Sequence, residues 1–146
     1  MKHYLLGIFC SVFAFSLNAG QVMKSTIPDP ETALGALVRK ADRAIIRYDL
    51  AGDDFSRVTE VAWLGHFAEK LEAASYSVRL PIAAIAFPEI SFYSGDELLL
   101  KLMLLPGGYL RCSTKSGGED FYVGEDLCDS LSELAMREKI TRKFKF

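Results

Sequence analysis

Three short turn sequences divide the stretch from residue 82 to residue 123 into four apolar segments. The turns are Ser94-Gly95-Asp96, Pro106-Gly107-Gly108 and Ser116-Gly117-Gly118, and the segments are residues 82–93, 97–105, 109–113 and 121–123. Glycine-containing turns between apolar runs are typical of β-hairpins. Because strands joined by tight turns must be antiparallel, this stretch predicts an antiparallel meander. Residues 98–105 are apolar on both sides, so we expect them at the centre of the sheet.

Apolar residues at helical spacing predict three helices, over residues 31–41, 57–74 and 126–139. Asp29 followed by Pro30 is typical of the start of the first helix, and Ser56 is a suitable cap for the second. Residues 44–50 alternate as in a strand. The order α-β-α-β-β-β-β-α predicts a two-layer α+β fold, in which two to three helices cover one face of an antiparallel meander sheet of four to five strands.

The first 19 residues have the pattern of a secretory signal peptide. Lys2 gives a positive start, residues 4–17 carry no charge, and the small residues Asn18, Ala19 and Gly20 follow; we expect cleavage after Ala19. A retained membrane anchor is the alternative, because the uncharged run to Val22 approaches the roughly 20 residues that span a bilayer. The sequence thus predicts a signal peptide (1–19), a tether (20–29), one α+β domain (30–140) and a basic tail (141–146), in a periplasmic or secreted bacterial protein with no transmembrane segment after cleavage.

Composition and charge exclude several classes of protein. Of the 146 residues, 50% are hydrophobic and the formal net charge is only −2, which excludes an intrinsically disordered chain. A sequence pI near 5.7 argues against a nucleic-acid-binding protein. Residues 21–138 carry 12 basic and 19 acidic side chains, so this body would attract a basic partner protein by electrostatic steering.

Cleavage after Ala19 would remove Cys10 and leave two cysteines, Cys112 and Cys128. An even number of cysteines in an oxidising compartment predicts one disulfide, here between the last helix and a strand. Two separate buried thiols are the alternative. Two cysteines and one distant histidine lack the spacing of a metal site, so we expect no metal and no cofactor.

The sequence contains none of the common nucleophile, zinc, Walker or dinucleotide motifs. His66 would be the one imidazole of the mature chain, and the helical wheel places it away from the apolar stripe. We therefore expect a solvated histidine and a protein without catalytic activity. The alternative is a hydrolase of unfamiliar type that uses His66 with a nearby carboxylate.

Acidic pairs and aromatic residues near turns give the candidate partner-binding surface. Tyrosine and arginine are favoured at interfaces, and acidic loops would contact a basic partner. The candidates are Asp53, Asp54, Tyr109, Arg111, Glu119, Asp120, Tyr122 and Glu125. The sequence thus predicts an exported protein-binding module, most concretely an inhibitor or immunity-type protein acting on an envelope-targeting enzyme or toxin. An envelope assembly accessory that uses the basic tail is a further alternative.

Overall fold

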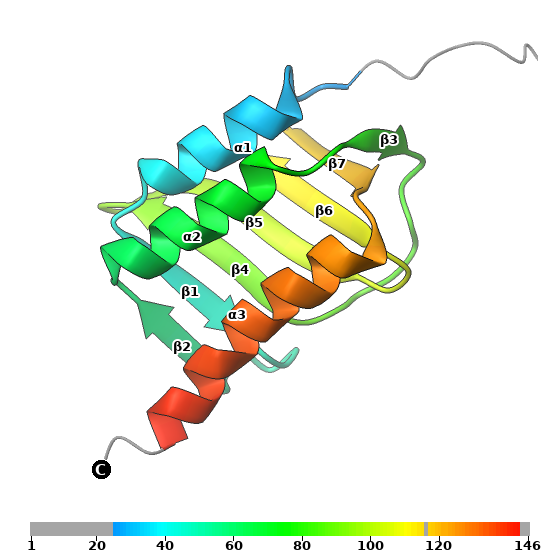
Figure 1. Cartoon of the computed structure of the whole chain (residues 1–146). Coiled ribbons are helices and arrows are strands. Elements are labelled where there is room, and N and C mark those ends of the chain that lie inside the picture. Colours follow the sequence, from blue (N-terminus) through cyan, green and yellow to red (C-terminus); the bar gives the residue numbers. More distant parts are fainter. Residues whose placement is uncertain (1–24, 116, 144–146) are drawn as a thin grey trace, which may run out of the picture.

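A computed structural model describes residues 25–115 and 117–143, and this part of the chain contains three helices and seven strands (Figure 1). In chain order the elements are α1 (Pro30–Arg39), β1 (Arg43–Arg47), β2 (Phe55–Val58), α2 (Val61–Glu72), β3 (Ser77–Arg79), β4 (Glu89–Ser94), β5 (Glu97–Leu105), β6 (Tyr109–Thr114), β7 (Gly117–Tyr122) and α3 (Glu125–Lys143). The predicted signal peptide and residues 20–24 of the predicted tether lie outside the described residues. Within them, no helix is long and apolar enough to cross a membrane.

The strands form one antiparallel sheet in the order β2-β1-β4-β5-β6-β7-β3. The consecutive strands β4 to β7 are the predicted meander, and β5 lies at the centre of the sheet as expected. The α+β class is confirmed. The strand number was underestimated, because the short edge strands β2 and β3 were not predicted.

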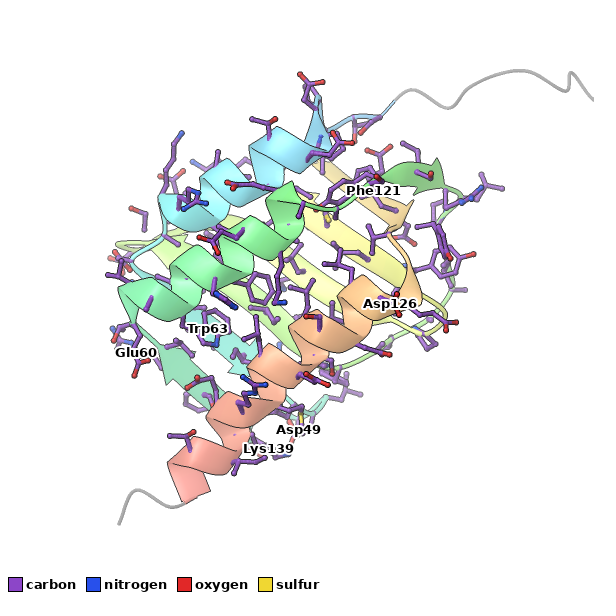
Figure 2. All side chains as sticks on the ribbon, viewed as in Figure 1. Asp49, Glu60, Trp63, Phe121, Asp126 and Lys139 are labelled. Carbon is purple, nitrogen blue, oxygen red and sulfur yellow. The ribbon has the colours of Figure 1, made fainter. Side chains whose placement is uncertain are left out.

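All three helices cover the same face of the sheet (Figure 1), and the core lies between these two layers. Phe67, Phe92 and Phe121 are fully buried there. Trp63 stacks on Phe67 with ring centroids 5.1 Å apart, and its indole N–H donates to the carbonyl of Leu134 at 3.5 Å, which joins α2 to α3. Trp63 and Phe121 lie toward opposite sides of the core (Figure 2).

The structure corrects the start of the second predicted helix. We expected a helix from residue 57 with Ser56 as its cap, but α2 begins at Val61 and β2 occupies Phe55–Val58. Ser56 and Val58 are buried while the residues between and before them are exposed. This alternation is the period of a strand, and it allows β2 to pair with β1, where Ser56 lies opposite Ile46.

A second correction concerns residues 82–93, which we expected to form one strand. Only Glu89–Ser94 is a strand, β4, and residues 80–88 form a connection that we call the strap. Pro81 and Pro88 have no N–H to donate to a strand neighbour, so they disfavour continuous pairing. The sheet order also requires a connection, because β3 lies beside β7 and the chain must pass β7, β6 and β5 to reach β4.

The last helix is longer than the predicted 126–139. Because α3 ends at Lys143, it includes the first three residues of the predicted tail, and residues 144–146 lie outside the described residues. Lys139 joins α3 to the sheet edge: its ammonium lies 2.5 Å from a carboxylate oxygen of Asp54 and 4.8 Å from the ring centroid of Tyr48.

The structure has Cys112 and Cys128 as free thiols in place of the predicted disulfide. Cys112 lies on β6 and points into the core, while Cys128 lies in the first turn of α3. The Cys128 thiol donates to the carbonyl of Tyr109 at 3.5 Å. Burial raises the pKa of Cys112 and brings the pKa of Cys128 to about 11. The pairing is therefore corrected to two buried thiols, the alternative left open by the sequence.

Candidate functional site

The candidate site lies on the side of the sheet away from the helices, which we call the open face. Successive residues of a strand point to opposite faces. In β1, Ala44 and Ile46 are fully buried under the helices, so Arg43, Ile45 and Arg47 belong to the open face. The register of the sheet extends this assignment to the other strands.

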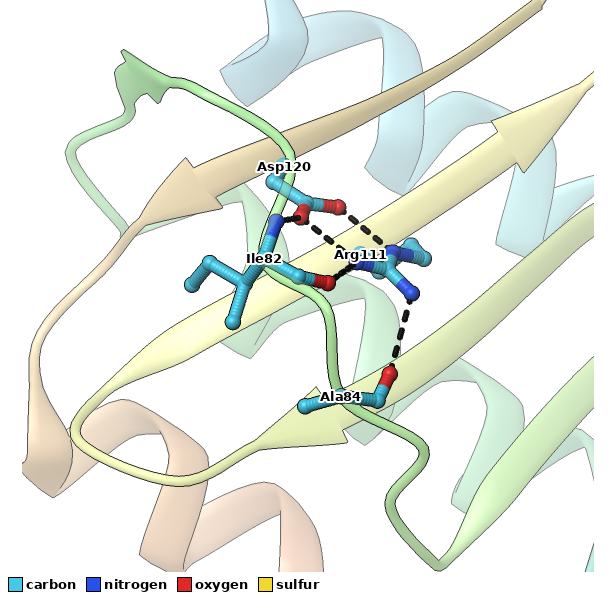
Figure 3. Close-up of polar contacts among 4 residues, drawn as sticks. All are labelled: Ile82, Ala84, Arg111 and Asp120. Carbon is cyan, nitrogen blue, oxygen red and sulfur yellow. Dashed lines mark hydrogen bonds and ion pairs between the residues drawn. The ribbon is translucent and has the colours of Figure 1, made fainter.

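The strap crosses part of the open face and is fastened there by Arg111 and Asp120 (Figure 3). These residues are cross-strand partners on β6 and β7. The Arg111 Nε and one terminal nitrogen donate to the two carboxylate oxygens of Asp120 at 2.7 and 2.8 Å. Arg111 also donates to the carbonyls of Ile82 and Ala84, and the Ile82 N–H donates to Asp120 at 2.7 Å.

This arrangement, the strap clamp, consists of Arg111, Asp120 and the strap backbone at Ile82 and Ala84. Hydrogen bonds from Arg111 hold the pKa of Asp120 below its ordinary value and outweigh burial, which raises it. The same bonds raise the pKa of Arg111. Because Asp120 is only 3% exposed, its carboxylate is occupied inside the protein. Both residues were predicted to bind a partner, and the structure gives them contacts with the strap.

Two further predicted residues, Tyr109 and Tyr122, lie side by side on the open face at this end of the sheet. Their rings are 5.3 Å apart in an edge-to-face arrangement, and the Arg79 guanidinium lies 5.7 Å from the Tyr122 ring. A hollow of about 420 Å³ is lined by Val78, Arg79, Leu80, Ile82 and Tyr109. The structure therefore unites four predicted residues, two as a surface aromatic pair and two as the strap clamp.

The remaining predicted residues lie elsewhere. Glu119 accepts hydrogen bonds from Ser25 Oγ at 2.6 Å and from the Thr26 N–H at 3.0 Å, so it holds the segment that leads into α1. Asp53 and Asp54 lie between β1 and β2, at the sheet edge opposite to β7 and β3. Glu125 is exposed in the first turn of α3. The eight candidates therefore do not form one surface.

The sequence did not reveal the second part of the open face, which the strap leaves uncovered. It carries four cations on β1, β2 and β5, and we call this surface the basic half: Arg43, Arg47, Arg57 and Lys101. Glu89 on the neighbouring strand β4 is a nearly buried acid that lies 3.4 Å from both Arg47 and Lys101. Arg43 and Arg47 each lie two residues from Ile45 in the sequence. Alternate residues of a strand point to the same face, so this spacing could have placed both arginines on one face of the sheet.

The four cations of the basic half differ in the acidic side chains that lie near them. Arg43 lies 4.9 Å from the Tyr93 ring centroid and 3.3 and 4.0 Å from Asp42 and Asp96 at the rim. Arg57 is exposed and has no ion pair with any residue in the described part of the chain. The four cations thus lie against three acids, Asp42, Asp96 and Glu89, so the basic half has an excess of one positive charge.

The helix side carries the histidine of the alternative hydrolase hypothesis. The His66 side chain is 63% exposed and its Nδ1 lies 3.8 Å from Glu69. It lines a small hollow of about 110 Å³ with Lys70, Ser130 and Glu133 among others. Within residues 25–115 and 117–143, no group of three or more His, Cys, Asp or Glu side chains is placed to hold a metal ion.

The fold and this site define an α+β protein with a one-sided helical layer and a partly strapped open sheet face. Comparison of the chain with family models, with curated proteins and with solved structures gave no match.

Proposed function

We propose that this protein is an exported, non-catalytic module that binds another protein through its open face. In its most concrete form it is an inhibitor or immunity-type protein that acts on an enzyme or toxin directed against the cell envelope. Export rests on the signal-peptide pattern of residues 1–19.

The observation that supports binding is the composition of the open face. Leu80 and Ile85 of the strap are each 71% exposed, although both are large aliphatic side chains. Tyr122 is also exposed, beside Tyr109. Apolar and aromatic side chains beside arginines are the composition of interface anchors, and a strap fastened by hydrogen bonds lowers the ordering cost of binding.

The experiment is capture of a partner by the tagged protein from envelope extract at low salt, identified by mass spectrometry and then assayed for activity. We expect one stoichiometric partner whose enzymatic or toxic activity falls when the protein is added. The variant Ile85→Glu should lose the partner. A control is Val61→Glu, which changes a still more exposed aliphatic residue at the start of α2 and should retain the partner.

Two results would contradict this proposal. The first is capture of nothing beyond background. The second is loss of the biological effect in His66→Ala while partner binding persists, which would support the alternative hydrolase. His66 lies on α2, on the side of the sheet opposite to the open face, so an inhibitor that binds through the open face tolerates that change.

A further inference from the structure

We infer that the basic half of the open face binds an acidic segment of the partner protein. This inference rests on the proposed function and adds the chemistry of the partner. It also reverses the expectation from total charge: residues 21–138 are acidic overall, which favoured a basic partner, but the charges are not evenly distributed over the surface.

The spacing of the cations defines what the surface can recognise. In the sheet register, Arg57 on β2, Ile45 on β1, Ser91 on β4 and Lys101 on β5 form one row across the strands. Three strand steps separate Arg57 from Lys101, or roughly 14 Å at the usual strand spacing. Arg47 lies two residues along β1 from Ile45, roughly 7 Å away. Three cations are thus presented on one face of a hydrogen-bonded sheet.

The charges of this surface are incompletely balanced within the protein. Glu89 is 8% exposed and is shared by Arg47 and Lys101, and the structure describes no acid paired with Arg57. Carboxylates of a partner could bind Arg57 with charge-assisted hydrogen bonds. They could bind Arg47 and Lys101, which share Glu89, in the same way. Arginine supplies a planar fork that suits carboxylates.

The apolar strap adjoins the basic half and favours a protein segment over other anions. The strap ends at Pro88, immediately before Glu89, to which the two cations bind. An acidic segment with aliphatic side chains would contact the apolar strap near its junction with β4 and the cations around Glu89 together. Nucleic acids and anionic membranes have a much higher charge density, so the net negative charge of this chain opposes their approach more strongly than that of a short acidic segment.

The first test uses a short synthetic peptide of alternating glutamate and leucine as the probe, with the purified protein and backbone amide NMR at low salt. We expect shifts confined to β1, β2, β4, β5 and the strap. We also expect affinity to fall about tenfold or more in Arg57→Glu and in Lys101→Glu, and to fall in higher salt. The control Arg137→Glu makes the same charge change at an exposed position of α3 and should bind normally.

The comparison probes are the same peptide with lysine in place of glutamate, phosphatidylglycerol vesicles and a single-stranded DNA oligonucleotide. Tighter binding of the lysine peptide, the vesicles or the DNA would overturn the inference, as would shifts on the helices. Equal loss of affinity in Arg57→Glu and Arg137→Glu would overturn it too, because the effect would then reflect net charge.

The second test separates this inference from the proposed function. The partner captured from envelope extract is titrated with the wild-type protein and with Arg57→Glu. Weaker binding by the variant supports the acidic segment on the basic half. A partner that is captured and inhibited equally by both proteins leaves the proposed function standing and overturns this inference alone. Binding of the acidic peptide without any captured partner would support the surface chemistry and contradict the proposed function.

Discussion

The strap clamp makes a sharp prediction about stability, through the change Arg111→Met. Methionine retains much of the length of the arginine side chain but none of its donors. The change removes both hydrogen bonds to Asp120 and the bonds to the carbonyls of Ile82 and Ala84. Asp120 would then be a buried carboxylate whose remaining donor in the clamp is the Ile82 N–H.

The magnitude follows from the burial of the two partners. Breaking a buried ion pair by removing one partner costs about 3–5 kcal/mol, because it leaves an uncompensated charge. The side chain of Arg111 is 28% exposed, whereas that of Asp120 is 2% exposed. Water can therefore reach the carboxylate once the guanidinium is gone, which reduces the expected loss to about 2–3 kcal/mol. A domain stable by about 5–15 kcal/mol stays folded after such a loss.

The assay is urea unfolding, in which the midpoint should fall at unchanged slope. Native-state hydrogen exchange of the Ile82 amide should become faster, because its acceptor belongs to the broken clamp. In the double variant Arg111→Met/Asp120→Leu no charge is left buried, so we expect it to be more stable than Arg111→Met alone. A loss below about 1 kcal/mol in Arg111→Met, or a double variant less stable than the single one, would refute the reasoning.

Three further predictions concern acid stability, a glycine turn and the thiols. The pKa of Asp120 is lowered in the folded state. Its stabilising contribution is therefore complete above the ordinary aspartate pKa of about 4 and is lost as pH falls through the folded pKa. The urea midpoint should fall less steeply with acid in Asp120→Asn than in the wild type, and an equal slope would contradict this. Gly108→Ala should lower the free energy of unfolding more than Gly95→Ala, for which we expect a loss of about 1–2 kcal/mol. Both glycines have positive φ, but a Cβ at Gly108 would lie 2.6 Å from backbone atoms of residues 124 and 125, while a Cβ at Gly95 would meet open space. Equal losses of stability in urea unfolding would argue against this difference. Because burial raises the pKa of Cys112 and Cys128, a maleimide at neutral pH should label neither thiol in the folded protein and both in urea, whereas rapid labelling of the folded protein would contradict their burial.

The meander could be predicted because its determinants are local. The turns at Gly95 and Gly107 are marked in the sequence by residues that tolerate positive φ, and both glycines have it. The segment between these turns is the central strand β5. From Leu98 to Leu105 its residues are apolar on both faces apart from Lys101, and such residues are best placed where neighbouring strands flank them on both sides.

The edge strands and the strap could not be predicted in this way. β3 has three residues, Ser77–Arg79, and its one partner strand, β7, lies some forty residues later in the chain. β2 has four residues directly before a helix, and helical spacing from residue 57 onward hid it. Short strands carry few periods of alternation, so their pairing is decided by long-range contacts.

The strap clamp was missed for a reason of register. The sequence placed Gly117 and Gly118 in a turn, so Asp120 was not part of a strand. In the structure Thr114 pairs with Gly117, and β7 begins there. This register places Asp120 directly opposite Arg111. A shift by one residue would turn either side chain to the helix side, so the candidate pair could be named from the sequence but not placed.

The open face differs from a sheet surface that merely faces water. Antiparallel sheets commonly expose one polar face, and a solvated face is expected to mix charges of both signs. Here Arg47 and Lys101 of the basic half share Glu89, and the strap that carries the exposed Leu80 and Ile85 joins β4 at this residue. The ion pair between Arg111 and the buried Asp120 also holds that apolar strap on the surface. Burying a charge is costly unless it is paired, and in the clamp Arg111 pairs with Asp120. The clamp therefore holds the strap in place without leaving a buried charge unpaired, and the exposed apolar side chains of the strap are the feature that the proposed binding function uses.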